Sequence, residues 1–416
     1  MKYVRHITSV ITIVLIAVLA AGTVVERLHG SDFALEHVYG TWWFVGLWAL
    51  MAGLLVYMAV KYRMWKRMAV CVLHLAILFI LLGALLTMLT GQHGRMLLEP
   101  GKPTQTFYEG NATENHPVAL PFTLTLDRFE IETYAGTNKP KDYISYLQLT
   151  DGDHHQEAVI SMNHILKHKH YRFYQSDYDA TGNSILDVAH DPWGIAITYI
   201  GYAMLFFALV AMLIQRRDTP KAVTWSWLSV LVILLVALFI RMRVHTLLPV
   251  LRSPFFSLHI STIVTAYALL LAIMVVGIIA VIRPKDKARL ERLKSLSTAM
   301  LYPAVALLAI GIFIGAVWAN VSWGNYWSWD PKEVWALITL LVYAAPLHGK
   351  LWKSFQKPLF FHVYVTVAFL SVLFTYFGVN LLLGGIHAYS EASNPKSITF
   401  VPEFGFFNRR LIGNPV

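Results

Sequence analysis

The stretch SWGNYWSWDPKEVW, residues 322–335, concentrates tryptophan beside charged groups, in a gap between two apolar segments. Its tryptophans and its central acid are Trp323, Trp327, Trp329, Trp335 and Asp330. Tryptophan commonly anchors a helix at a membrane interface. Four tryptophans together with charges, a glycine and a proline indicate instead a surface that holds a flat, largely apolar ligand.

Four histidines lie inside apolar segments or at their ends: His74, His259, His348 and His387. An ionisable side chain within a membrane span is a functional candidate by default. Two neutral imidazoles on opposite faces of a flat cofactor are the axial ligands of many haem irons. A single histidine near a helix end is more often an interfacial hydrogen-bonding group than a ligand, so spacing alone leaves both interpretations open.

The elements that must position these residues are membrane helices. Of the 416 residues, 56% are hydrophobic and only 14% are charged, and the mean hydropathy is +0.54. This composition excludes an ordinary soluble protein. The net charge of +10 could suit nucleic acid, but the basic residues form short clusters beside apolar runs, which is a membrane topology pattern. We therefore expect lipid contact and no nucleic-acid partner.

Nine apolar segments approach the length of about 20 residues that a membrane-spanning helix needs. They fall near 7–25, 43–60, 68–90, 193–214, 223–241, 257–282, 298–319, 333–348 and 359–382. The first has a basic start but no convincing cleavage site, so we expect it to be a retained span. The predicted fold class is an all-α polytopic membrane protein with a small β-rich domain between the third and fourth helices.

The basic clusters predict which end of each helix faces the cytoplasm. They follow the second, fourth, sixth and eighth segments, and the N-terminus is also basic. If the helices alternate in direction, all of these clusters lie on one side, which is then cytoplasmic. His74 and His348 consequently share the inner leaflet. The outer side holds His259, His387 and the stretch 322–335, which we call the tryptophan run.

Residues 91–192 form the one long polar insertion, on the outer side. Alternating apolar and polar residues predict strands in PFTLTLDRFEIETY (121–134), DYISYLQLTD (142–151) and, less cleanly, HKHYRFYQSDYD (168–179). We interpret its histidines mainly as surface residues: His154, His155, His164, His168 and His170. A composition shift at RRDTPKAVTW predicts two modules, 1–218 and 219–416.

Cys71 is the single cysteine. A disulfide framework, a CxxC redox pair or a zinc site cannot come from this chain alone, so any thiol chemistry needs a partner's sulfurs. Arg241, Arg243 and Arg252 lie on the predicted outer side, against the usual bias. They are candidates for an anionic ligand or, alternatively, for contact with lipid headgroups.

Several segments carry a family resemblance. The stretch WGNYWSWDPKEVWALITLLVYAAPLHGK closely resembles the WWD signature of CcsA, the haem-handling subunit of the system II cytochrome c biogenesis machinery. SPFFSLHISTIVTAYALL and FGVNLLLGGIHAYS resemble its two flanking histidine segments. The N-terminal half resembles its partner ResB, also called CcsB, in VYGTWWFVGLWALM, LHLAILFILLGALL and FYQSDYDATGNSILDVAHDPWG. The resemblance covers nearly the whole chain as a ResB–CcsA fusion, with the WWD segment at 318–335.

The resemblance implies a holocytochrome c synthase that handles haem b. Haem would enter at a transmembrane pair, His74 and His348, and pass to an external pair, His259 and His387. The haem vinyl groups would then be joined to the cysteines of a CxxCH apocytochrome c as thioethers. The resemblance further implies catalytic roles for the WWD tryptophans and Asp330, and haem contacts from Trp318, Tyr326 and Arg252.

The same resemblance implies separate thiol–disulfide reductant proteins as partners and a bacterial inner membrane location. The N-terminus would be cytoplasmic, and the WWD segment and the β-rich domain would be periplasmic. The outer domain is shorter than in most ResB proteins, and the CcsA-like half has fewer helices than usual before His259. These departures affect substrate docking and haem entry more than the outer site.

Two other functions remain open at this point. A haem exporter or chaperone without covalent ligation would keep both histidine pairs and lose any dependence on CxxCH. A structural scaffold of a respiratory assembly would use Trp323 to Trp335 only as interface anchors, and it would carry no chromophore.

Overall fold

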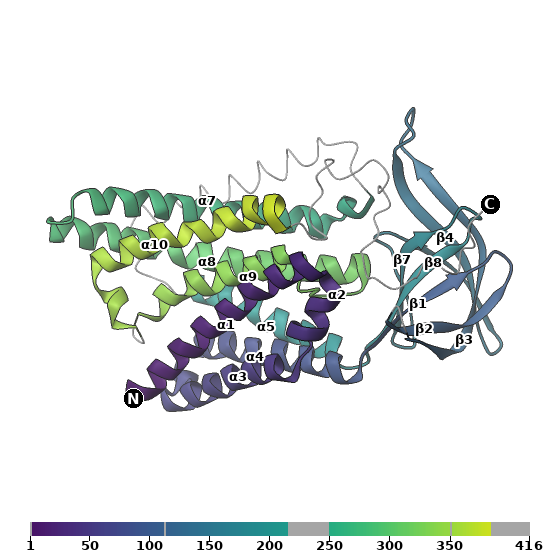
Figure 1. The fold of residues 1–416 in the computed structure, drawn as a ribbon, viewed down its shortest axis with the longest axis horizontal. Helices are drawn as coiled ribbons and strands as arrows, with labels where there is room; N and C mark the ends of the chain where they lie inside the picture. The colour runs from purple at the N-terminus through teal and green to yellow at the C-terminus, as the bar shows by residue number, and fades with distance from the viewer. Residues whose placement is uncertain (1, 112–113, 215–248, 350–351, 384–416) are drawn as a thin grey trace.

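The computed structural model describes residues 2–111, 114–214, 249–349 and 352–383. The molecule is elongated (Figure 1), with a bundle of helices along its long axis and a curved β-sheet at one end. We call the end of the bundle next to this sheet the sheet end. The N-terminus lies at the opposite end.

The helices before residue 215 are α1 (Lys2–His29), α2 (Ser31–Ala34), η1 (Leu35–Tyr39), α3 (Trp42–Lys61), η2 (Met64–Lys66), α4 (Met68–Thr90) and α5 (Gly194–Ile214). The later helices are η3 (Pro249–Arg252), α7 (Pro254–Ile282), α8 (Lys287–Trp323), α9 (Pro331–Ala344), η4 (Ala345–His348), η5 (Lys353–Gln356), α10 (Pro358–Leu373) and η6 (Phe374–Leu383).

Seven helices of the described residues are long and apolar enough to cross a membrane, so the chain is a multi-pass membrane protein. They correspond to seven of the nine predicted spans. The predicted span at 223–241 lies outside the described residues. The predicted span at 333–348 corresponds to α9 and η4, and the 14 residues of α9 are shorter than a full crossing. The count of nine spans stays a prediction.

Helix α8 extends well beyond the predicted span at 298–319, to 37 residues. Its start is capped by Asp286, whose carboxylate accepts a hydrogen bond of 2.9 Å from the main-chain N–H of Arg289. Its end is Gly324, which has a left-handed φ of 88°. A Cβ at Gly324 would lie 2.9 Å from the ring of Tyr174 in the sheet. Glycine is thus needed there both to end the helix and to admit the sheet.

The strands are β1 (Gln92–Leu98), β2 (Pro103–Asn111), β3 (Glu114–Thr133), β4 (Pro140–Asp151), β5 (His154–Ser161), β6 (Leu166–His168), β7 (Tyr171–Tyr178) and β8 (Ser184–His190). They form one antiparallel sheet in the order β5-β4-β3-β2-β1-β8-β7-β6. Strands β5 and β6 are consecutive in the chain yet lie at opposite edges, so the sheet curls round on itself. This curling is visible in Figure 1.

The β-rich domain predicted between the third and fourth helices is confirmed. Strands β3, β4 and β7 coincide with the three predicted segments, although the third segment also contains a turn. Lys169 and His170 both have positive φ, 46° and 67°. This is the conformation of a tight two-residue hairpin turn, and it separates β6 from β7.

Apolar and polar residues alternate along these strands, so the apolar side chains lie together on one face of the sheet and form its core. Phe107, Leu124, Leu147 and Phe173 come from four different strands and are almost completely buried in it. Because side chains alternate along a strand, the intervening polar residues face outward.

Polar contacts fix this sheet to the C-terminal end of α8. Arg172 of β7 donates a hydrogen bond of 2.9 Å to the side-chain oxygen of Asn320. The hydroxyl of Ser322 in α8 donates a bond of 3.3 Å to the side-chain oxygen of Asn163, whose amide donates a bond of 2.8 Å to the carbonyl of Pro249 in η3. The sheet therefore lies directly beside the start of the tryptophan run.

Candidate functional site

His74 and His348 face each other near the end of the bundle away from the sheet. His74 lies in the second turn of α4, and His348 ends η4. Their ring centroids are 6.2 Å apart and their planes are nearly perpendicular, at 89°. Two imidazoles bound on opposite sides of one metal ion, each at about 2 Å, hold their ring centroids about 6 Å apart. The observed spacing suits such an axial pair.

Both rings are oriented by the main chain one turn earlier. Nδ1 of His74 lies 2.8 Å from the carbonyl oxygen of Val70, and Nδ1 of His348 lies 2.9 Å from that of Ala344. A carbonyl only accepts, so Nδ1 carries the hydrogen and the neutral ring has its lone pair on Nε2. Metal-binding histidines commonly use this arrangement, because it fixes the tautomer and the ring orientation. Both rings are thus prepared to bind a metal through Nε2.

His259 lies in the second turn of α7, at the sheet end of the bundle. Its Nδ1 donates a hydrogen bond of 2.7 Å to the carbonyl of Gly311 in α8, so it has the same tautomer. One turn further along α8, a Cβ at Gly315 would lie 2.6 Å from this Nδ1. Glycine at position 315 is what allows the imidazole to approach the helix.

Trp318 and Trp323 form a buried layer beside His259. The ring of Trp318 is nearly parallel to the imidazole, with centroids 6.4 Å apart and an interplanar angle of 19°. Its indole N–H donates to the carbonyl of Val250 at 3.3 Å. Trp323 meets Trp318 edge-on at 4.9 Å and packs with Met162 of the sheet domain. Only 1% of Trp318 and 5% of Trp323 are exposed, so both support His259 from within the protein.

Trp329 and Trp335 pack in another direction, against the N-terminal helices, while Trp327 packs against the cluster of α7, α8 and α10. Trp329 stacks on Tyr39 of η1, with centroids 4.7 Å apart and planes only 7° from parallel. Trp335 donates a hydrogen bond of 3.2 Å from its indole N–H to the hydroxyl of Thr23 in α1. Trp327 meets Trp329 edge-on at 5.9 Å. The run therefore packs in more than one direction, with one part near His259 and another on the N-terminal helices.

Asp330 begins helix α9. Its carboxylate accepts a hydrogen bond of 2.9 Å from the main-chain N–H of Lys332, and only 1% of the residue is exposed. Glu333 reaches back and accepts a bond of 2.7 Å from the main-chain N–H of Ser328. This reciprocal arrangement resembles a capping box, and it ties the tryptophan run to the first turn of α9.

Tyr326 connects the tryptophan run to α5. Its ring lies edge-on to Tyr199 at 5.4 Å and to Tyr202 at 6.0 Å. Burial raises the pKa of Tyr326 well above its ordinary value, so the hydroxyl stays protonated. It is a neutral hydrogen-bonding group inside an aromatic cluster.

Arg252 ends η3 on the exposed surface at the sheet end. Its guanidinium donates a bond of 3.4 Å to the carbonyl of Lys141 and lies 5.8 Å from the ring centroid of Tyr134. It thus contacts the sheet domain, just before α7, the helix that carries His259. The other predicted residues, His387, Arg241 and Arg243, lie outside the described residues.

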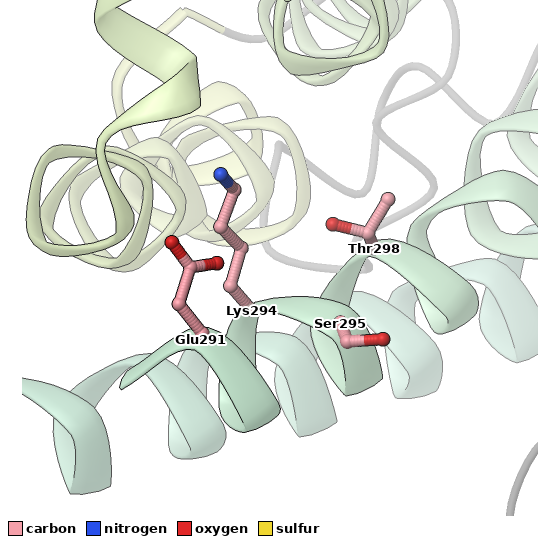
Figure 2. A pocket seen from close by; sticks show the side chains of 4 residues that line it. All are labelled: Glu291, Lys294, Ser295 and Thr298. Atoms are coloured by element: carbon pink, nitrogen blue, oxygen red, sulfur yellow. The ribbon is translucent and has the colours of Figure 1, made fainter. Parts of the chain in front are cut away.

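A cavity of about 190 Å³ opens on α8 near the end away from the sheet, lined by Glu291, Lys294, Ser295 and Thr298 (Figure 2). Thr298 precedes Gly311 by about 20 Å along the helix axis, so the cavity is separate from His259. Across the residues that the structure describes, no group of three or more metal-binding side chains is found.

Two regions of the chain match known protein families. Residues 57–189 match the ResB-like family, and residues 193–387 match the cytochrome C assembly protein family. The two matches lie one after the other in a single polypeptide. The ResB-like region supplies His74, and the assembly region supplies His348, so each region contributes one ring to the pair. Helix α5 falls within the second match, whereas the predicted module boundary at 218/219 stays a prediction.

Individual relatives are similar over part of the chain. Protein NrfI of Wolinella succinogenes is 37% identical over 158 residues, which are 36% of this chain and 17% of that protein. Cytochrome c biogenesis protein CcsA of Chlamydomonas reinhardtii is 40% identical over 34% of this chain and 42% of its own length. CcsA of Prochlorococcus marinus is 36% identical over 34% of this chain and 57% of its own length. The chain thus spans well under two thirds of these relatives.

Sequence reasoning did not identify the N-terminal residues that contact the tryptophan run. Tyr39 and Phe44 both touch Trp329, yet they entered only as part of a resemblance. The aromatic density of VYGTWWFVGLW was the available signal. Gly311 and Gly315 were also missed, although their spacing of four residues places both on one face of α8.

Proposed function

We propose that the protein is a cytochrome c synthase of the system II type. Haem b first binds between His74 and His348, and then passes to the outer side. There it is held by His259 and His387 beside the tryptophan run. The observation that carries this proposal is the pair of imidazoles 6.2 Å apart, each hydrogen-bonded through Nδ1 to the main chain.

The covalent step joins haem vinyl groups to the two cysteines of a CxxCH apocytochrome c. Each S–H adds across a vinyl C=C bond: sulfur bonds to one carbon, the hydrogen goes to the other, and the π bond is lost. The addition is redox-neutral, so the protein's main contribution is positioning. Well-oriented reactants can gain roughly 7 to 11 kcal/mol of the barrier in this way.

In this mechanism, the histidine of CxxCH replaces one outer ligand of the haem iron and brings both thiols to the vinyl edge. The aromatic residues around His259 hold the imidazole in place. The thiols must be reduced before they can add. Because Cys71 is the only cysteine, the reductant for the apocytochrome must be a separate thiol–disulfide protein.

The proposed location is a bacterial inner membrane, with the sheet end of the bundle in the periplasm. The distribution of basic residues supports this orientation. Helix α3 begins near the tryptophan run and ends at the far end of the bundle. Its last residue is Lys61, and the basic residues Arg63, Lys66 and Arg67 follow. Positive residues are enriched in cytoplasmic loops.

The first test is the reduced absorption spectrum of the full-length chain, purified in detergent from a haem-replete host. His74→Ala/His348→Ala should lower the haem content, and added imidazole should partly restore it. His362→Ala is the matched control. His362 is also a buried histidine of the bundle, but its Nε2 rather than its Nδ1 bonds a carbonyl, that of Leu290.

The second test is co-expression with a CxxCH apocytochrome c. Holocytochrome should form with the intact chain and should be lost in His259→Ala or His387→Ala. A haem-loaded chain that never yields holocytochrome would point to a haem exporter or chaperone. A colourless chain from a competent host would reject both functions.

A further inference from the structure

The segment before residue 57 lies outside both family matches, yet it forms one wall of the tryptophan run. Helix α1 packs against α9, and Figure 1 shows the purple α1 and α2 beside the green α9. Helices α1 and α9 also share an apolar cluster that includes Leu15, Leu19, Val334 and Ile338. An N-terminal segment that lies outside both family matches is thus part of the site's surroundings.

The tryptophan run contains an uncommon backbone conformation. Trp329 has a φ of 60°, in the left-handed region. A bulky residue rarely adopts this conformation, and it persists only where the surroundings enforce it. Because Trp329 directly precedes Asp330, the N-cap of α9, its backbone sets the direction in which the chain enters that helix.

The surroundings that enforce this conformation come from the N-terminal segment. The indole of Trp329 stacks on Tyr39 at 4.7 Å and meets Phe44 edge-on at 5.0 Å. Only 4% of Tyr39 and 1% of Phe44 are exposed. Stacked and edge-on geometries are the favourable arrangements for aromatic pairs. The indole is therefore held between two buried rings.

Tyr39 is itself fixed against α1. Its hydroxyl donates to the carbonyl of Leu19 at 3.4 Å. A Cβ at Gly22 would overlap the tyrosine ring, so the glycine provides the slot in which the ring lies. One residue further on, Thr23 accepts the hydrogen bond from Trp335. One turn of α1 thus fixes two points of the tryptophan run.

We propose that Tyr39 is a positioning residue that holds Trp329, and through it the tryptophan run, in the conformation that haem attachment needs. The functional part of this inference rests on the proposed synthase function, whereas the positioning itself does not. Loss of an aromatic pair of this kind should change the population of the held conformation roughly threefold to tenfold.

The test uses the full-length chain in detergent and compares Tyr39→Leu, Tyr39→Phe and Phe361→Leu. Phenylalanine keeps the stack, while leucine removes it. Phe361 is a similarly buried ring in the cluster formed by α7, α8, α10 and Tyr343 of α9, whereas Trp329 packs in the other cluster, with Tyr39 and Phe44. Hydrogen exchange of the amides of 324–333 should be roughly threefold to tenfold faster in Tyr39→Leu only. Holocytochrome yield should fall in that variant and recover in Tyr39→Phe.

A double-mutant cycle separates positioning from general damage. If Tyr39 acts through Trp329, then Tyr39→Leu should cause no further loss of yield in a Trp329→Leu background, whereas Phe361→Leu should add its own effect in full. If Tyr39→Leu fails to fold, Gly22→Ala displaces the same ring from the side of α1 and serves as the second variant.

Unchanged exchange at 324–333 in the leucine variant would overturn the inference, and so would faster exchange without any loss of yield. These outcomes are distinct from failure of the proposed function. If the exchange responds as expected but the unaltered chain makes no holocytochrome, the positioning contact stands and the synthase function fails.

Discussion

Replacing Gly315 by alanine should weaken the outer haem site and leave the inner pair intact. The new Cβ would lie 2.6 Å from Nδ1 and 2.7 Å from Cε1 of His259. Ordinary contacts begin at about 3.4 Å, so the imidazole must move by nearly 1 Å. Its hydrogen bond to Gly311 is 2.7 Å long, and such a shift takes it beyond about 3.2 Å, where these bonds weaken.

The size of the effect follows from what that hydrogen bond does. In stability alone, a neutral hydrogen bond is worth about 0.5 to 1.5 kcal/mol. For a histidine that binds metal, losing the partner of its other nitrogen typically costs 10- to 100-fold in affinity, since the ring orientation is no longer fixed. We therefore expect haem to bind the outer site about 10 to 100 times more weakly in Gly315→Ala.

The assay is a haem titration, followed by absorption, in a His74→Ala/His348→Ala background that leaves only the outer site. Gly277→Ala is the matched control. A Cβ at Gly277 would also be crowded, lying 3.1 Å from a main-chain oxygen of α10, but this position is about 27 Å along α7 from His259. Equal haem affinity in Gly315→Ala and in the unaltered background would refute the role given to the Gly311 contact.

Three further outcomes are expected. His348→Ala should lower the haem content of the purified chain with partial rescue by imidazole, whereas His362→Ala should not; equal losses would argue against an inner pair. Asp330→Ala removes the N-cap of α9 and should destabilise the protein by about 0.5 to 2 kcal/mol, measured by thermal unfolding, while Asp330→Asn should retain most of the cap. Hydrogen bonds from Lys169 and then from a neighbouring histidine lower the pKa of Asp151 in the folded sheet domain. The ionised Asp151 therefore stabilises the folded state above the ordinary carboxyl pKa of about 3.9, and this stabilisation is lost as the pH falls through and below that value. Between pH 5 and 3, the thermal unfolding temperature should depend less on pH in Asp151→Asn than in the unaltered chain.

The membrane helices could be predicted because each depends on its own local composition. Apolar runs at 68–90 and 193–214 became α4 and α5 almost to the residue. The N-terminal extension of α8 could not be found in this way, because its first three turns are rich in charge. Asp286 is a residue type that often begins helices, but a prediction based on hydropathy does not consider capping residues.

The sheet shows the difference between local and distant information. Alternation predicted β3, β4 and β7 from residues that neighbour each other in sequence. The pairing of β1 with β8 joins Gln92 to His190 across most of the domain. Such an order depends on which edges meet in three dimensions, and a single sequence carries no direct signal of it.

The candidate site also has some features that local sequence predicts and others that depend on distant contacts. Charge bias and span length predicted that His74 and His348 share one side of the membrane, and their rings lie 6.2 Å apart in the structure; the sidedness itself stays a prediction. Topology could not show that Trp323 and Trp329 pack in different directions. That separation depends on the sheet meeting the end of α8 and on η1 meeting the start of α9, and both are tertiary contacts.

Both candidate sites depend on contacts between distant parts of the chain. The inner pair takes His74 from the ResB-like region and His348 from the assembly region. If haem binds between them as proposed, it would strengthen the association of the two regions. By linkage, the association strengthens haem binding by the same factor. In one polypeptide the two regions are already joined, whereas separate chains would first have to find each other in the membrane. Substitutions at the contact surface of the two regions should consequently reduce the amount of haem retained, even where both regions stay folded.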